Sequence, residues 1–298
     1  MSHNYKKTDL YNFFKNSKLH SVKGNIFFDT YEELFSKYRN KQITFVEIGV
    51  KWGGSLFMWR DYFGEKAKII GVDFNPDTIK LEKYGFKIFI GDQSSEEFWN
   101  RFFSEVGKVD IILDDGGHTN ENQILTTYNT INHIKDGGLL VVEDTYSSYS
   151  KKFFNPSKYS FINYSKFLID DLNGRVSDKY KTKLNGVHKK RSLKSSIYSI
   201  KFFSNFVAFF IDRDKCIEYK EEINRDLEDK KSEIIKDDFV NPRWNSDIYN
   251  KGLINKTLLF LSKKFKFLKI NMIKNLIHKI KLFFIKKTIN KKLKNYFK

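Results

Sequence analysis

The chain has a single cysteine, Cys216, among its 298 residues, so it cannot form an internal disulfide. We therefore expect a reducing, cytoplasmic setting, and no motif around Cys216 indicates a nucleophile. The first residues lack the apolar stretch of a secretory signal peptide. No run of about 18 apolar residues occurs, so we predict no helix that crosses a membrane.

Acidic residues are missing from the last part of the chain. Residues 251–298 contain fifteen Lys and no Asp or Glu, so they supply fifteen of the eighteen net positive charges and leave residues 1–250 nearly neutral. A nucleic-acid-binding domain carries its basic residues on its own face, which argues against nucleic acid as a partner. The tail's apolar residues recur at near-helical spacing, which predicts a basic amphipathic helix on an anionic membrane surface. A helix that packs on its own domain or on a partner subunit would show the same pattern.

Four segments are expected along the chain. They are an N-terminal helical extension (1–40), an α/β domain (41–215), a charged helical linker (216–250) and the basic tail (251–298). In the extension, Asp29 is a candidate cap for a helix whose Tyr31, Leu34 and Phe35 share one face. We expect that helix to pack on the sheet or at a subunit contact.

The first predicted strand, 43–50, runs into a glycine-rich turn and a helix that ends at Phe63. Gly49, Gly53 and Gly54, followed by Ser55, would let the backbone turn tightly and let a ligand approach. The spacing E-x-G-x-x-x-G-G-S lacks the G-x-G-x-x-G dinucleotide fingerprint. Simple strand-to-helix geometry would also explain these glycines.

The next two predicted strands end in polar residues. Strand 68–74 contains Asp73, and an acid at this position typically binds the ribose hydroxyls of an adenosine ligand. Asn75 and a proline then open a helix. After strand 86–90 come Asp92 and Gln93, where an adenine edge could be bound, and then Ser94 and Glu97, which form a capping-box pattern.

The central stretch, 109–149, predicts strand, crossover helix and strand. Apolar runs 109–113 and 139–142 end in acidic pairs, Asp114-Asp115 and Glu143-Asp144. A right-handed crossover makes such strands neighbours with their carboxyl ends at one sheet edge, so Asp115, Glu143 and Asp144 should converge beside His118. Three carboxylates and an imidazole indicate a metal site with a base beside it. Acids that only cap the following helices are the alternative.

A helix at 161–173 is predicted to end at Gly174, and strands 197–203 and 206–211 form a hairpin around Ser204-Asn205. This hairpin would add antiparallel strands to the sheet. Seven strands in this order resemble the sheet of class I methyltransferases more than a nicotinamide-binding sheet.

Seven motifs follow one another along the chain: EIGVKWGGSLFMWRDYF, GVDF, GDQS, LDDGGH, VEDTYSSY, FLIDDLN and SIYSIKFF. With them the chain resembles the metal-dependent sugar O-methyltransferases of the macrocin and mycinamicin type, over roughly residues 40–212. The resemblance implies an α/β fold with a Rossmann-like class I methyltransferase sheet, mostly parallel with a terminal antiparallel hairpin, here flanked by helical N- and C-terminal extensions. The chain has Gly117 where the family often has Ser, and Lys201 where a His is common.

The resemblance also implies roles for individual residues. The magnesium ligands would be Asp115, Glu143 and Asp144, with His118 as general base. The S-adenosylmethionine site would be made by Glu47, Gly49, Gly53, Gly54, Ser55, Asp73, Asp92, Gln93 and Asp114. Tyr146 and Tyr149 are candidates for the acceptor pocket, although packing would explain them equally.

The expected reaction is methyl transfer from S-adenosylmethionine to a sugar hydroxyl. A divalent metal such as Mg²⁺ lowers the pKa of a bound hydroxyl, and a histidine can take its proton at physiological pH. We expect a sugar or nucleotide-sugar acceptor destined for a surface polysaccharide or a glycosylated metabolite. The alternatives are a catechol-like acceptor, or a membrane- or nucleic-acid-binding protein with a vestigial site. We also expect a homo-oligomer in the cytoplasm, at the inner face of the membrane if the tail binds it.

Overall fold

The structure is a computed structural model that describes residues 5–153, 159–175, 193–220 and 222. Nearly all of them belong to one compact unit, Met1–Glu221. The predicted basic tail and most of the charged linker lie outside the described residues. Among those described, no helix is both long enough and apolar enough to cross a membrane.

One sheet organises the described residues, and it has seven strands in the order β3-β2-β1-β4-β5-β7-β6. The strands are β1 (Thr44–Ile48), β2 (Lys68–Asp73), β3 (Lys87–Ile90), β4 (Val109–Asp114), β5 (Ile134–Glu143), β6 (Ile197–Phe203) and β7 (Phe206–Ile211). The first five are parallel, whereas β7 is antiparallel to β5 and β6 to β7. The predicted fold class is therefore confirmed, including the terminal hairpin.

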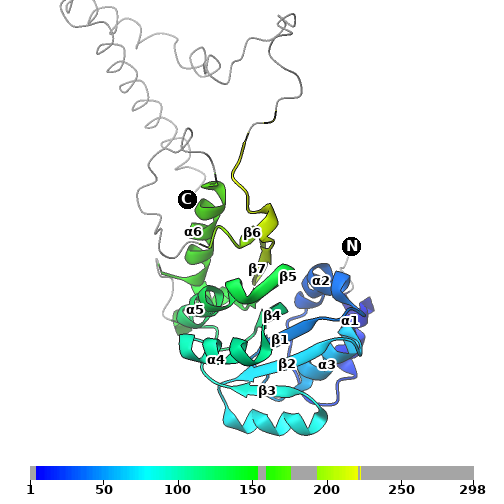
Figure 1. The fold of residues 1–298 in the computed structure, drawn as a ribbon. Coiled ribbons are helices and arrows are strands. Elements are labelled where there is room, and N and C mark those ends of the chain that lie inside the picture. Colours follow the sequence, from blue (N-terminus) through cyan, green and yellow to red (C-terminus); the bar gives the residue numbers. More distant parts are fainter. Residues whose placement is uncertain (1–4, 154–158, 176–192, 221, 223–298) are drawn as a thin grey trace, which may run out of the picture. The chain divides into compact units, whose positions relative to one another are not determined.

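Helices cover both faces of the sheet (Figure 1). They are α1 (Asp9–Lys15), α2 (Phe27–Phe35), α3 (Gly54–Phe63), α4 (Glu96–Val106), α5 (Asn120–Thr130) and α6 (Phe161–Asn173). Short 3-10 helices span Tyr5–Lys7, Ser36–Tyr38, Pro76–Tyr84, Ile131–His133, Thr145–Tyr149, Lys151–Phe153 and Arg213–Lys215. Residues of α2 and α3 share one apolar cluster with one face of the strands, and residues of α4 and α6 share a second cluster with the other face. The parallel strands are thus buried on both sides, as their continuous apolar runs require.

Two helix starts differ from the prediction. Helix α2 begins at Phe27 and has no side-chain cap, and Asp29 lies in its first turn. Burial of Phe27 and Phe28 explains the earlier start. Helix α4 is capped by Ser95, which accepts from the Phe98 amide, because the Ser94 hydroxyl is engaged by the Asn122 amide at 2.7 Å.

The N-terminal segment packs into the core, as expected for its helix. Tyr31 and Phe35 of α2 are fully buried. Residues 17–24, which connect α1 to α2, lie against the start of α3. There the Gly54 amide donates to the His20 carbonyl at 3.2 Å, and the Ser17 hydroxyl donates to the Gly54 carbonyl at 2.6 Å. This contact places the segment at the carboxyl edge of the sheet.

Candidate active site

A cavity of about 850 Å³ opens where the parallel strands end. Eight predicted site residues line it: Gly49, Ser55, Asp73, Asp92, Gln93, Asp115, His118 and Asp144. The predicted residues Glu47, Gly53, Gly54, Asp114, Glu143, Tyr146 and Tyr149 are not among its lining residues. His20, Ser21 and Val22 of the N-terminal segment also line it. The cavity therefore brings the glycine turn and the acidic strand ends together in one space.

The turn after β1 is held by close backbone contacts. Gly49 has a φ of +87°, and a Cβ there would collide with the main-chain carbonyl of Asp115. A Cβ on Gly54 would collide with the carbonyl oxygens of Leu19 and His20. Gly49 thus permits contact with the loop after β4, whereas Gly54 permits the N-terminal segment to dock.

Glu47 stabilises this turn from a fully buried position. One carboxylate oxygen accepts from the Ser55 hydroxyl at 2.7 Å, and the other accepts from the Trp59 indole at 3.1 Å. Its carboxylate also lies 3.6 Å from the Lys23 ammonium. The side chain is therefore occupied by neighbours within the protein.

Asp73 is oriented by two main-chain amides, those of Lys51 at 2.9 Å and Asn75 at 2.8 Å. Each carboxylate oxygen keeps a second lone pair, so both remain able to accept from a ligand.

Gln93 is buried and donates to Asp114 at 2.9 Å. Asp114 is also buried, and its second oxygen has no partner among the described residues.

The side chains of Asp115, His118 and Asp144 gather in the same cavity, with one ligand atom from each within 4.8 Å of the others. The His118 Nε2 atom lies 3.5 Å from an Asp144 oxygen and 3.8 Å from an Asp115 oxygen. His118 and Asp144 both have positive φ, 54° and 56°, a strained conformation that often occurs at functional sites. The pKa of Asp144 is raised, because burial and the nearby Asp115 carboxylate raise it more than His118 lowers it. A bound cation would favour the charged carboxylates, so this donor set fits a hard divalent ion.

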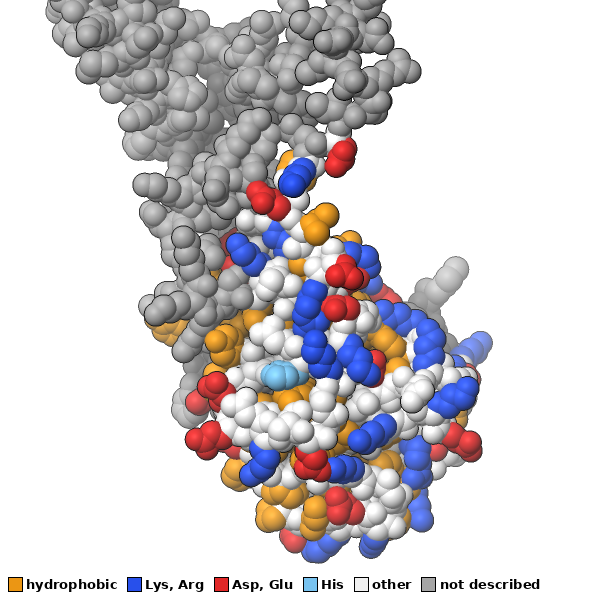
Figure 2. All heavy atoms as spheres, in the orientation of Figure 1, with side chains coloured by type: hydrophobic (Ala, Val, Ile, Leu, Met, Phe, Trp, Pro, Cys, Tyr) orange, Lys and Arg blue, Asp and Glu red, His pale blue; other side chains and the backbone are white. Residues whose placement is uncertain are grey.

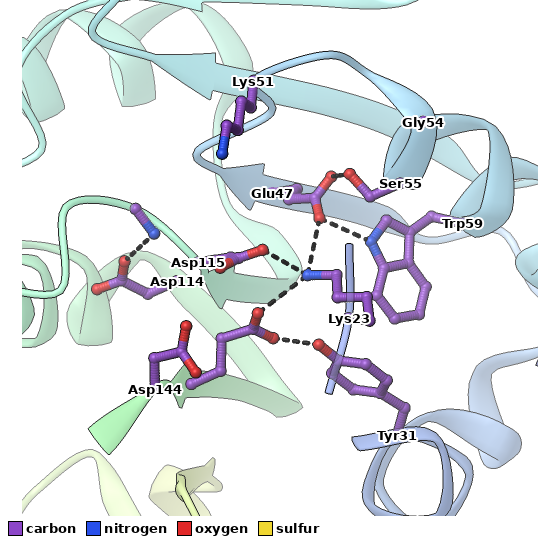
Figure 3. Close-up of polar contacts among 12 residues, drawn as sticks. Lys23, Tyr31, Glu47, Lys51, Gly54, Ser55, Trp59, Asp114, Asp115 and Asp144 are labelled. Atoms are coloured by element: carbon purple, nitrogen blue, oxygen red, sulfur yellow. Dashed lines mark hydrogen bonds and ion pairs between the residues drawn. The ribbon is translucent and has the colours of Figure 1, made fainter. Parts of the chain in front are cut away.

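Glu143 is buried beside this group but does not line the cavity, and both of its carboxylate oxygens have partners within the protein. One of its oxygens accepts from Lys23 at 2.9 Å, and the other accepts from the Tyr31 hydroxyl. Figure 3 shows the Lys23 ammonium between the strand ends, where it also contacts Asp115 at 2.5 Å. Burial lowers the pKa of Lys23, but the carboxylates of Asp115 and Glu143 raise it well above its usual value.

Nothing in the sequence marked Lys23 as a site residue. It stands in the N-terminal segment, outside the resemblance, and it is far in sequence from its partners. The available signal was indirect, because several acids predicted to meet at one sheet edge need a counter-charge.

Tyr146 and Tyr149, the candidate acceptor residues, lie on the short helix Thr145–Tyr149 and are 47% and 65% exposed.

Comparison with known proteins shows that the chain is similar to a group of enzymes. No family model matches the chain. It is 35% identical over 126 residues to mycinamicin VI 2''-O-methyltransferase of Micromonospora griseorubida, and 32% identical over 126 residues to demethylmacrocin O-methyltransferase of Streptomyces fradiae. It is 31% identical over 154 residues to a rhamnosyl tetracenomycin-C 2'-O-methyltransferase of Streptomyces olivaceus. The chain resembles sugar O-methyltransferases. These matches cover 40%, 40% and 48% of this chain but only 31%, 31% and 40% of the respective relatives.

The fold shows the same resemblance. The MycE methyltransferase of mycinamycin biosynthesis, in complex with Mg and SAH, matches 76% of this chain and 59% of its own with a TM-score of 0.61 and 24% identity. MycE in complex with Mg, SAH and mycinamycin VI matches 75% of this chain and 58% of its own with a TM-score of 0.60 and 26% identity. The expected resemblance and the class I methyltransferase fold are therefore confirmed.

Proposed function

We propose that the chain transfers the methyl group of S-adenosylmethionine to a sugar hydroxyl with the help of a divalent cation such as Mg²⁺. The single observation that supports this proposal is that one cavity joins the glycine turn and Asp73 to the group of Asp115, His118 and Asp144. A methyl donor and an activated acceptor must lie within one space for direct transfer. The relatives methylate sugar-bearing molecules according to their names, and the MycE structures hold Mg and SAH.

The cofactor end of the cavity is assigned to the turn and to the ends of β2 and β3. Asp73 accepts hydrogen bonds from the ribose hydroxyls, and Asp92 faces the adenine. Gln93 supports this end from beneath, since its side-chain amide binds Asp114 and Thr126 and accepts from the Gly117 amide. Gly49 and Ser55 lie along the chain of the cofactor. Glu47, Gly53, Gly54 and Asp114 shape this end through their neighbours, since the cavity is not lined by them.

The acceptor end is assigned to the carboxylate–histidine group. Asp115 and Asp144 would hold the cation, which when bound lowers the pKa of an acceptor hydroxyl and orients it. His118 Nε2 lies beside both carboxylates. It accepts the hydroxyl proton as the hydroxyl oxygen attacks the methyl group, and the bond from that methyl to the sulfonium sulfur breaks to leave SAH. Glu143, expected as a third ligand, keeps its contacts with Lys23 and Tyr31. The exposed rings of Tyr146 and Tyr149 follow directly after Asp144 and are proposed to contact the sugar.

The acceptor is proposed to be a sugar with a vicinal diol, linked to a nucleotide or to a larger molecule of a surface polysaccharide or a glycosylated metabolite. Calorimetry should show that SAH binds and NAD does not. Methyl transfer should then be measured on a panel of nucleotide sugars, glycosides and catechols, with and without EDTA. We expect transfer to a sugar that EDTA abolishes and Mg²⁺ restores. Transfer only to catechols would reassign the acceptor, and the absence of SAH binding would overturn the proposal.

A further inference from the structure

The Lys23 ammonium lies between three carboxylates of three different strands. It is 2.5 Å from Asp115 at the end of β4, 2.9 Å from Glu143 of β5 and 3.6 Å from Glu47 of β1. Its side chain is 1% exposed, as is that of Glu143, and that of Glu47 is fully buried. The positively charged ammonium of Lys23 thus lies at the point where the acidic strand ends converge (Figure 3).

Asp115 is shared between two sides of the site. Its Oδ2 atom faces Lys23, and its Oδ1 atom is the one that lies 3.8 Å from His118 Nε2. Glu143 has no such free side, because its side chain is buried away from the cavity, with Lys23 on one of its oxygens and Tyr31 on the other. A divalent cation can therefore reach Asp115 and Asp144 from the cavity, but it can reach Glu143 only by displacing an internal partner.

We propose that Lys23 is a tethered counter-ion that competes with the divalent cation for Asp115 and Glu143, and so sets both the affinity and the ligand set of the metal site. The inference rests on the proposed function, since it concerns the cation assigned there. With Lys23 in place, the cation is held on the outer side by Asp115 and Asp144. Like charges that share one carboxylate repel each other, so the ammonium weakens divalent binding.

The tether also connects the metal site to the cofactor cavity. Lys23 directly follows His20, Ser21 and Val22, which line the cavity, and His20 is fixed by the Gly54 amide at 3.2 Å. If the cation and Lys23 compete for the same carboxylates, then cation binding must weaken the contacts of Lys23, by thermodynamic linkage. The segment that carries Lys23 is then fixed less firmly. Lys23 thus acts as a positioning residue for one cavity wall.

The test compares Mn²⁺ binding to the full-length protein and its variants by calorimetry, without cofactor. Lys23→Met should bind Mn²⁺ at least about tenfold more tightly than wild type, because the competing charge is gone and Glu143 is freed. Adding Glu143→Gln to Lys23→Met should cancel that gain, and Lys23→Arg should behave as wild type. Lys18→Met is the matched control, since Lys18 is in the same segment but lies over the Tyr84 ring, 4.8 Å from its centroid.

A merely structural Lys23 predicts the opposite sign, because a disturbed site binds metal more weakly. Equal or weaker Mn²⁺ binding by Lys23→Met, or a gain that survives Glu143→Gln, overturns the proposal. SAH binding is measured on the same samples and tests the cofactor site separately. Should Lys23→Met not fold, hydrogen exchange decides in the wild type. Saturating Mg²⁺ should speed exchange of the Gly54 amide several-fold, and unchanged or slower exchange would reject the competition.

Discussion

Gly49 lies so close to Asp115 that no side chain fits between them. A Cβ on Gly49 would overlap the Asp115 carbonyl, and the Asp115 amide donates to the neighbouring Ile48 carbonyl at 3.1 Å. The turn assigned to the cofactor and the loop assigned to the metal are therefore one packed unit. A change on either side is expected to reach the other.

Replacement of Gly49 by Ala should weaken both folding and SAH binding. The left-handed backbone costs a non-glycine residue about 1–2 kcal/mol, and the collision with Asp115 adds to it. Gly85→Ala is the matched control, because Gly85 has a left-handed φ of +84° but nothing within 4 Å of its Cβ position. Urea unfolding and calorimetry provide the two measurements. Equal losses in both variants would show that the contact with Asp115 is unimportant.

Asp73→Ala should weaken SAH binding by about 1–3 kcal/mol, because a ribose diol would lose its charged acceptor. The variant also frees the Lys51 and Asn75 amides, so Asp73→Asn should be measured alongside it. Asp77→Ala is a suitable control, since Asp77 pairs with Lys80 on the surface. If Asp73→Ala bound SAH as tightly as wild type, the ribose assignment would be wrong.

His118→Asn should lower kcat by roughly 10²–10⁴-fold if His118 is the general base. Because Asp115 and Asp144 remain, Mn²⁺ affinity should change little. His133→Gln, which alters a histidine on the surface of the second apolar cluster, should leave kcat unchanged. A collapse of Mn²⁺ affinity in His118→Asn would instead identify the imidazole as a metal ligand.

His133 should make folding stability depend on pH. Its ring stacks on Phe103 with the centroids 4.1 Å apart, and burial, Lys108 and Arg213 lower its pKa. The unfolded chain then binds a proton more readily than the folded one, so stability is highest above the ordinary histidine pKa of about 6.5 and falls as the pH drops through it. Urea unfolding at pH 7.5 and 5.5 should show a smaller difference for His133→Gln. An unchanged difference would remove His133 as the cause.

The basic tail is proposed to bind anionic membranes, although it lies outside the described residues. Each Lys near such a surface contributes about 1 kcal/mol before screening. Full-length protein should co-sediment with anionic vesicles, less so at high salt, and a chain that ends at Asn250 should not. Methyl transfer in solution should survive the truncation. If truncation splits an oligomer or unfolds the protein, the tail is a packing element.

The parts of the fold that were predicted correctly are those specified by local pattern. Apolar runs ended by acids located β4 and β5, and Ser204-Asn205 located the hairpin, where Asn205 adopts a φ of +66°. The cap of helix α4 was predicted one residue too early, because a contact from Asn122 of α5 to Ser94 leaves Ser95 as the capping residue. The role of Lys23 could not be predicted, since its partners are brought to it only by the finished sheet.

The charge distribution on the surface also agrees with the sequence. Figure 2 shows acidic and basic side chains intermixed on one face of the described residues. This agrees with a nearly neutral body and a charge excess that the sequence assigns to residues 251–298. Partners of strong negative charge are therefore expected at the tail and not on this face.

The position of Lys23 also bears on the order in which the protein folds. Lys23 is 92 residues from Asp115 and 120 residues from Glu143, so the ribosome makes it long before either partner exists. Contacts of such separation carry a large loop-closure cost and form late. The Lys23 contacts are thus among the last to form, and Lys23 docks between the strand ends only after β5 is in place.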